Sequence, residues 1–120
     1  MKFEKLVPSV FYKNIQDSHK LFVDCLEFSI IVDESGAPYP FYVIEKDGLG
    51  LLIYQNAEYA EKEKPELRLV TKNIEEVYEK VAATHPELLH PNLKKVTLRE
   101  WGAKEFAILD GQVGIRFQQW

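Results

Sequence analysis

The hydrophobic and polar positions of this chain follow one order of elements twice. Residues 5–12 are rich in Val, Phe and Tyr, which predicts a strand. Asn14 follows as a candidate helix cap, and apolar side chains then recur at three- and four-residue spacings. This spacing predicts one buried helix face, made of Ile15, His19, Phe22, Cys25 and Leu26.

Three further strands are predicted after this helix. Residues 28–32 are short and apolar, whereas residues 33–38 have turn composition throughout. Residues 39–46 and 49–54 predict a hairpin around Asp47-Gly48, because this dipeptide favours the tight turns that join antiparallel strands. The first half of the chain therefore predicts a βαβββ module.

The same order begins again after a charged, linker-like stretch that ends at Pro65. Lys72-Asn73-Ile74 repeats Lys13-Asn14-Ile15, an offset of 59 positions from residue 13 to residue 72. Such a repeat predicts two equivalent modules. We expect a single domain over residues 1–120, with module one at about 1–56, a linker at about 57–65 and module two at about 66–120.

The second module closes with residues 99–118, which predict a strand, a turn at Asp110-Gly111 and a last strand. Trp101 stands beside Gly102 just before the first of these strands. A Trp there can form one wall of an apolar cleft, with its N–H free for a polar partner. The alternative is that Trp101 is an ordinary core residue.

Composition and charge narrow the classes of partner. The chain has 120 residues, 46% of them hydrophobic and 28% charged, which is typical of a soluble globular protein. Its net charge is −4 without a long basic run, so nucleic acid and anionic membrane are poor candidates. The first residues lack the apolar core of a signal peptide, and Cys25 is the only cysteine. We therefore expect a cytoplasmic protein.

The two βαβββ modules, with a strand–helix start at residues 8–15, resemble the vicinal oxygen chelate superfamily. This superfamily includes glyoxalase I, extradiol dioxygenases and bleomycin resistance proteins. Residues 101–106, followed by Asp110-Gly111 and residues 115–117, look like the Trp-Gly-x-x-Glu-Phe pattern and its downstream motifs in the bleomycin-resistance branch. The resemblance implies an α+β fold in which two βαβββ modules form a curled, cup-shaped mixed sheet. It also implies a homodimer.

The resemblance can also be tested at the metal-ligand positions of the metal-dependent members. Carried over residue by residue, these positions fall on Val7, Glu66 and Arg116, and near Leu51. Val and Leu side chains cannot coordinate a metal, and an arginine would repel a divalent cation. We therefore expect no metal, no cofactor and no metal-assisted catalysis at this site.

The remaining candidates are aromatic residues on or beside the predicted strands, which could line the cup. The expected ligand-binding residues are Trp101, Phe41, Tyr54, Phe117 and Arg116. The sequence thus favours a metal-free small-molecule-binding protein of the glyoxalase/bleomycin resistance type, sequestering an antibiotic or another aromatic or cationic ligand, with no catalytic residue. One alternative is a metal-dependent lyase or isomerase resembling glyoxalase I. Another is a structural domain whose cup is filled.

Overall fold

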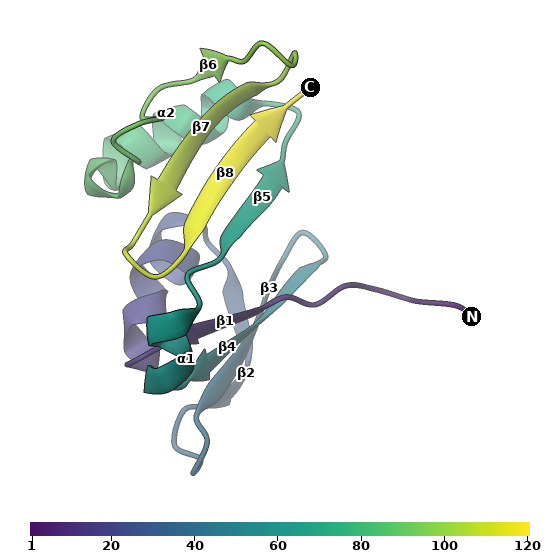
Figure 1. Cartoon of the computed structure of the whole chain (residues 1–120), viewed down its shortest axis with the longest axis vertical. Helices are drawn as coiled ribbons and strands as arrows, with labels where there is room; N and C mark the ends of the chain where they lie inside the picture. Colours follow the sequence, from purple (N-terminus) through teal and green to yellow (C-terminus); the bar gives the residue numbers. More distant parts are fainter. The chain divides into compact units, whose positions relative to one another are not determined.

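The computed structural model describes residues 1–120 and divides them into two compact units, Met1–Glu63 and Lys64–Trp120 (Figure 1). Each unit contains one strand, a helical segment and three further strands. The predicted order of elements and the α+β class are therefore confirmed. None of the helices has the length and apolar character that a bilayer-spanning helix requires.

The first unit is a four-stranded mixed sheet with helical segments. Strand β1 runs parallel to β4, whereas β4 with β3 and β3 with β2 are antiparallel, which gives the order β1-β4-β3-β2. The strands are β1 (Ser9–Tyr12), β2 (Ser29–Glu34), β3 (Phe41–Lys46) and β4 (Leu49–Gln55). The helical segments are η1 (Ile15–Ser18), η2 (His19–Cys25) and α1 (Ala57–Lys62).

The helix of the first unit begins where the sequence predicts it. Asn14 is the N-cap and its side chain accepts a hydrogen bond from the backbone N–H of Gln16. A 3₁₀ turn, η1, leads into η2, a π-helical segment in which Leu26 N–H donates to the carbonyl of Leu21 at 3.0 Å. Most of the predicted apolar stripe is buried, and its most deeply buried members are Ile15 and Phe22.

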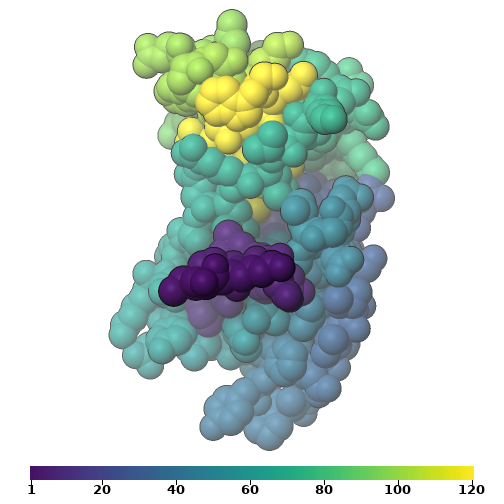
Figure 2. Space-filling model, turned by 90° about the vertical axis from the view of Figure 1, so that its right-hand side faces the viewer, coloured from purple at the N-terminus to yellow at the C-terminus, as the bar shows by residue number.

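Several element boundaries differ from the sequence-based expectation. Strand β1 begins at Ser9 rather than at residue 5, because Pro8 has no N–H to continue a ladder. Residues 1–7 precede it as an exposed segment, which lies on the surface in Figure 2. Strand β2 continues to Glu34, so the expected turn at residues 33–38 begins later than its composition indicates. The linker-like stretch contains helix α1, capped by the side chain of Asn56.

The second unit repeats this architecture. Strands β5 and β8 are parallel, the other neighbours are antiparallel, and the order is β5-β8-β7-β6. The elements are β5 (Glu66–Val70), α2 (Ile74–Thr84), η3 (Pro86–Leu88), β6 (Thr97–Leu98), β7 (Lys104–Leu109) and β8 (Gly114–Gln119). Figure 1 shows α2 lying along one face of this sheet. The opposite face is therefore available for a site built on the strands.

The two faces of the second sheet are chemically different. On the helix side, the Phe106 ring makes an edge contact with Tyr78 of α2 at 5.2 Å between ring centroids and stacks on Phe117 at 4.6 Å. Because side chains alternate along a strand, the neighbours of these residues point to the other face. That face carries Glu105, Arg116 and Gln118, so it combines charged and polar groups where the helix side is apolar.

Candidate functional site

A tight turn between β6 and β7 sets the position of Trp101. The backbone N–H of Arg99 donates to the carbonyl of Ala103 at 2.8 Å. The N–H of Gly102 donates to the carbonyl of Arg99 at 2.9 Å. Gly102 has a φ of +98°, which residues with a side chain rarely adopt. This is the physical reason for the Trp-Gly pair, and it leaves the indole within reach of the polar face of β7.

Glu105 is the centre of this face. Its side chain is fully buried, and both carboxylate oxygens have polar partners. Trp101 Nε1 donates to Oε2 at 2.9 Å, Gln118 Nε2 donates to the same oxygen at 2.6 Å, and Arg116 Nη1 lies 3.3 Å from Oε1. A buried charge is tolerated only when it is paired and hydrogen-bonded, and this carboxylate meets both conditions.

The surroundings of Glu105 keep it ionised. Burial alone raises the pKa of this carboxyl, because the charged form loses its hydration. Hydrogen bonds from Gln118 and Trp101, together with the positive charges of Arg116 and Arg99, outweigh burial, so the pKa lies below its ordinary value of 4.5. Glu105 is thus an anionic anchor at neutral pH and does not act as a proton donor there.

Two arginines flank this carboxylate. The guanidinium carbon of Arg99 lies 4.6 Å from the centroid of the Trp101 ring, a cation–π arrangement. Arg116 reaches a second carboxylate, since its Nε lies 3.3 Å from Oε1 of Glu66. Glu66 also lies 3.4 Å from Nε of Arg68. Arginines and carboxylates therefore alternate across the open face of the sheet.

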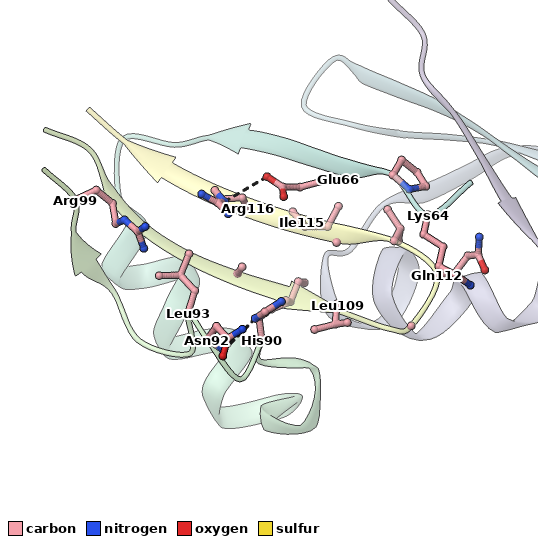
Figure 3. Close-up of a pocket in the computed structure, with 16 residues that line it drawn as sticks. Lys64, Glu66, His90, Asn92, Leu93, Arg99, Leu109, Gln112, Ile115 and Arg116 are labelled. Atoms are coloured by element: carbon pink, nitrogen blue, oxygen red, sulfur yellow. Dashed lines mark hydrogen bonds and ion pairs between the residues drawn. The ribbon is translucent and has the colours of Figure 1, made fainter. Parts of the chain in front are cut away.

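A pocket of about 450 Å³ opens beside this network, within the second unit (Figure 3). Its volume is in the range of small-molecule sites. The apolar lining is made of Pro65, Leu93, Ala107, Ile108, Leu109, Val113 and Ile115, with Gly111 and Gly114. The polar lining is made of Lys64, Glu66, His90, Asn92, Arg99, Gln112 and Arg116. The pocket thus combines an apolar floor with several hydrogen-bonding groups.

The residues expected to bind a ligand fall into three places. Trp101, 46% exposed, and Arg116 lie together at the polar face of the second sheet, joined through Glu105. Trp101 does not line the pocket itself, although its cation–π partner Arg99 does. Phe117 is buried and stacks on Phe106, which places it in the core beneath α2. Its neighbour Arg116 points to the pocket instead.

Phe41 and Tyr54 belong to the first unit. They are paired across β3 and β4, and their ring centroids lie 6.0 Å apart. Phe11 stacks on Tyr54 at 5.9 Å and meets the edge of Tyr59 at 5.1 Å. These four rings form an aromatic cluster on one face of the first sheet, in which Tyr59 is 47% exposed.

The positions carried over from the metal-dependent members do not form a metal site. Leu51 is buried, two positions from the buried Ile53 on the same strand, and Val7 precedes β1 as part of the exposed segment. The Glu66 carboxylate lies within ion-pair distance of two arginines. No group of three or more His, Cys, Asp or Glu side chains gathers anywhere in the chain. The donor set therefore does not fit a divalent ion.

Sequence reasoning missed the partners that organise the site. The expected ligand-binding residues did not include Glu105, Gln118 or Arg99. The sequence pattern assigns these three residues to a strand or a motif and gives them no binding role. One signal was available for Glu105. It is the only charged residue in the otherwise apolar run from residue 105 to residue 109, and it follows Trp101 by four positions. A buried strand that contains a carboxylate requires a partner for it.

Comparison with known proteins places the fold. No protein-family model matches the sequence, and no curated protein matches it. Solved structures do match. A member of the glyoxalase/bleomycin resistance protein/dioxygenase superfamily from Sphaerobacter thermophilus has a TM-score of 0.72 at 15% identity, covering 98% of both chains. This chain has the fold of that superfamily, the vicinal oxygen chelate superfamily.

Other solved structures with this fold differ in function. The bleomycin-binding protein from Streptomyces verticillus, in complex with copper(II)-bleomycin, matches with a TM-score of 0.76 at 16% identity, covering 100% of this chain and 98% of its own. A lactoylglutathione lyase from Agrobacterium tumefaciens matches with a TM-score of 0.71 at 6% identity, covering 98% and 95%. The vicinal oxygen chelate fold therefore includes both binding proteins and enzymes. Their different roles make the residues of the site, rather than the fold, the basis for a function.

Proposed function

We propose that this protein binds a small molecule in the pocket of its second module and acts by binding rather than by metal-assisted catalysis. The observation that carries the proposal is the pocket itself. It has a volume of about 450 Å³ and an apolar floor next to converging polar groups. The bleomycin-binding protein with the same fold supports a binding role. Sequestration of an antibiotic is one form that such a role would take.

The second candidate function is a metal-dependent lyase or isomerase, favoured by the likeness to a lactoylglutathione lyase. The donor set argues against it, because Arg116 stands at one of the carried-over ligand positions and is paired with Glu66, which stands at another. Metal analysis of the purified protein separates the two candidates. We expect less than stoichiometric zinc, nickel, manganese or iron, whereas one ion per chain, lost with activity on chelation, would favour the enzyme.

A filled-pocket variant tests the binding role. Gly114 lines the pocket at the start of β8, and a Cβ added there would meet only the carbonyl of Ile108, at 3.9 Å. Gly114→Ile therefore projects bulk from the strand without a backbone clash. Thermal-shift screening of a panel of small molecules should identify compounds that stabilise the wild type and not this variant.

The first module supplies a matched control for this variant. Gly50 has the equivalent place on β4, since it pairs with Glu45 as Gly114 pairs with Leu109. A Cβ at Gly50 would lie 4.0 Å from the carbonyl of Ile44, and Gly50 does not line the pocket. Gly50→Ile should bind the same compounds as the wild type. Equal binding by wild type and Gly114→Ile would contradict the assignment of the pocket.

We propose in addition that the protein is a homodimer. The proposal rests on the resemblance of the sequence to the vicinal oxygen chelate superfamily. It also rests on apolar side chains that are exposed on the edge strands of a single chain. Ile31 and Val32 on β2 are 54% and 40% exposed, and Leu98 on β6 is 70% exposed. Edge strands with exposed apolar residues are favourable places for association.

A further inference from the structure

We infer that the ligand of this pocket carries an anionic group, a carboxylate or a phosphate, next to an apolar body. The anionic group binds at the end of the pocket where Arg99 and Arg116 lie. This inference rests on the proposed binding function and specifies the chemistry of the ligand. The sequence led us to expect an aromatic or cationic ligand. An aromatic body stays compatible with the pocket, but a cationic group does not, because the pocket is itself cationic.

The charge of the pocket is opposite in sign to that of the chain. Three cationic side chains line it, Lys64, Arg99 and Arg116, against one carboxylate, Glu66. With the adjacent Arg68 and the buried Glu105 included, four cations face two carboxylates, an excess of two positive charges. The whole chain has a net charge of −4. The positive pocket is therefore a local feature that composition does not explain, and it attracts anions.

Arg99 is the cation best placed to bind an anion. No ion pair joins it to a carboxylate, although Glu105 lies near enough for Arg99 to lower its pKa. Its guanidinium is held 4.6 Å from the Trp101 ring centroid, and the indole N–H is fixed in turn by Glu105. A side chain held in this way loses little conformational freedom when a ligand arrives. Guanidinium groups match carboxylates and phosphates with paired, charge-assisted hydrogen bonds.

Arg116 is incompletely satisfied in the structure. Nη1 contacts the buried Glu105, but Nε, which is itself buried, makes no well-aligned hydrogen bond. Glu66 lies 3.3 Å from this Nε, and the Glu66 side chain is 48% exposed. A flexible, half-exposed carboxylate can turn away when a ligand oxygen takes its place. Glu66 thus marks where an anionic group fits beside Arg116.

The remainder of the pocket suits an apolar body. Leu93 and Ala107 are buried and line it, and Leu109 extends the apolar surface away from the arginines. Figure 3 shows Arg99 and Lys64 at opposite ends of the lining, with Leu109 nearer to Lys64. A ligand with its anionic group at Arg99 and Arg116 would place its apolar part along this floor.

Isothermal titration calorimetry with four matched compounds tests the inference on the full chain. The compounds are naphthoate, naphthyl phosphate, naphthamide and naphthylmethylamine, which share a ring system and differ in charge. At about 0.15 M salt, where weak surface attraction is screened, naphthoate or naphthyl phosphate should bind at least about tenfold more tightly than naphthamide. The tighter of the two anions identifies carboxylate or phosphate as the preferred group. Naphthylmethylamine should bind most weakly.

A charge-removing variant locates the anion. Arg99→Gln should weaken binding of the anionic compound by about tenfold or more and leave naphthamide binding unchanged. Lys72→Gln removes the same charge from an exposed residue outside the pocket and should change affinity by less than about twofold. Thermal unfolding of both variants confirms that they are folded.

The possible outcomes distinguish a failure of the anionic-ligand inference from a failure of the proposed binding function. Tighter binding of naphthamide or of the amine, or equal loss of affinity in the Arg99 and Lys72 variants, overturns the anionic ligand and leaves the binding function in place. Failure of all four compounds, together with no compound in the thermal-shift panel that distinguishes wild type from Gly114→Ile, overturns both.

Discussion

A single buried carboxylate organises the polar face of the second module. Glu105 accepts hydrogen bonds from Trp101 and Gln118 and lies beside Arg116, so its charge holds three side chains together, of which Arg116 lines the pocket. Glu105→Gln keeps the shape but removes the charge. We expect a loss of about 2–4 kcal/mol in the free energy of unfolding at pH 7. Glu100→Gln, an exposed residue of the same turn, should cost less than about 0.5 kcal/mol.

The pH dependence of this loss follows from the direction of the pKa shift. The pKa of Glu105 is lower in the folded protein than its ordinary value of 4.5, so the ionised form stabilises the fold above that value. The stabilisation disappears as the pH falls through the folded-state pKa. Chemical denaturation of wild type and Glu105→Gln should therefore give curves that converge below pH 4.5. A difference that stays constant down to pH 3 would contradict the role given to the charge.

At single residues, the sequence showed which side chains are special but not which way they face. The Trp101-Gly102 pair indicated an indole at a turn, and the positive φ of Gly102 explains why glycine is needed there. Phe117 and Arg116 are adjacent, so they face opposite sides of the sheet. Only the contact of Phe106 with Tyr78 of α2 decides which of them is in the core. That contact depends on packing between distant segments, which a single sequence does not show.

The helices of the two modules begin in the same way. In each, the side chain of the last residue of the closing strand accepts a hydrogen bond from the first helical N–H. Gln55 Oε1 accepts from Ile15 at 3.0 Å, and Gln119 Oε1 accepts from Ile74 at 2.8 Å. The Asn14 side chain accepts from the N–H of Gln16, and the Asn73 side chain accepts from the N–H of Glu76. The repeat of the sequence is therefore also a repeat of long-range hydrogen bonds.

This arrangement predicts that the glutamines are structural. Gln119→Ala should lower the free energy of unfolding by about 1 kcal/mol, because the N–H of Ile74 loses its acceptor at a part-buried helix end. Gln55→Ala should have an effect of similar size in the first module. Equilibrium denaturation measures both, with Gln16→Ala, an exposed residue whose side chain makes no hydrogen bond, as the control. Equal values for all three variants would show that the caps contribute nothing.

Elements were predictable where the signal was local. The Asp47-Gly48 hairpin is correct, and both residues have positive φ values of 52° and 79°. The last hairpin has a longer connection than the Asp110-Gly111 pair predicts, since β7 ends at Leu109 and β8 begins at Gly114. There the Asp110 side chain accepts from two backbone amides and closes a wider turn. The pattern of hydrophobic and polar residues gives little indication that a side chain caps a loop in this way.

At the scale of the whole molecule, the two modules share a plan but not a chemistry. One face of the first sheet carries an aromatic cluster of Phe11, Phe41 and Tyr54, with Tyr59 of α1 packed against Phe11. The open face of the second carries Glu66, Glu105 and Arg116. One backbone plan thus presents an aromatic surface in one module and a charged pocket in the other. The comparisons with solved structures establish this plan, and the residues on each face carry the proposed function.

The apolar side chains that a single chain leaves exposed lead to the last prediction. Strand β2 ends its sheet with one side unpaired, and a register shift between Ile30 and Val32 leaves Ile31 54% exposed. At the other sheet, Val70 on the edge strand β5 is 68% exposed. Edges with apolar residues favour pairing with another chain, and symmetric dimers are the commonest way to cover them.

We therefore expect light scattering to give twice the mass of one chain at micromolar concentration. The thermal midpoint should also rise with protein concentration, because dissociation accompanies unfolding of a dimer. A mass of one chain together with a midpoint independent of concentration would show that these edges remain open in solution.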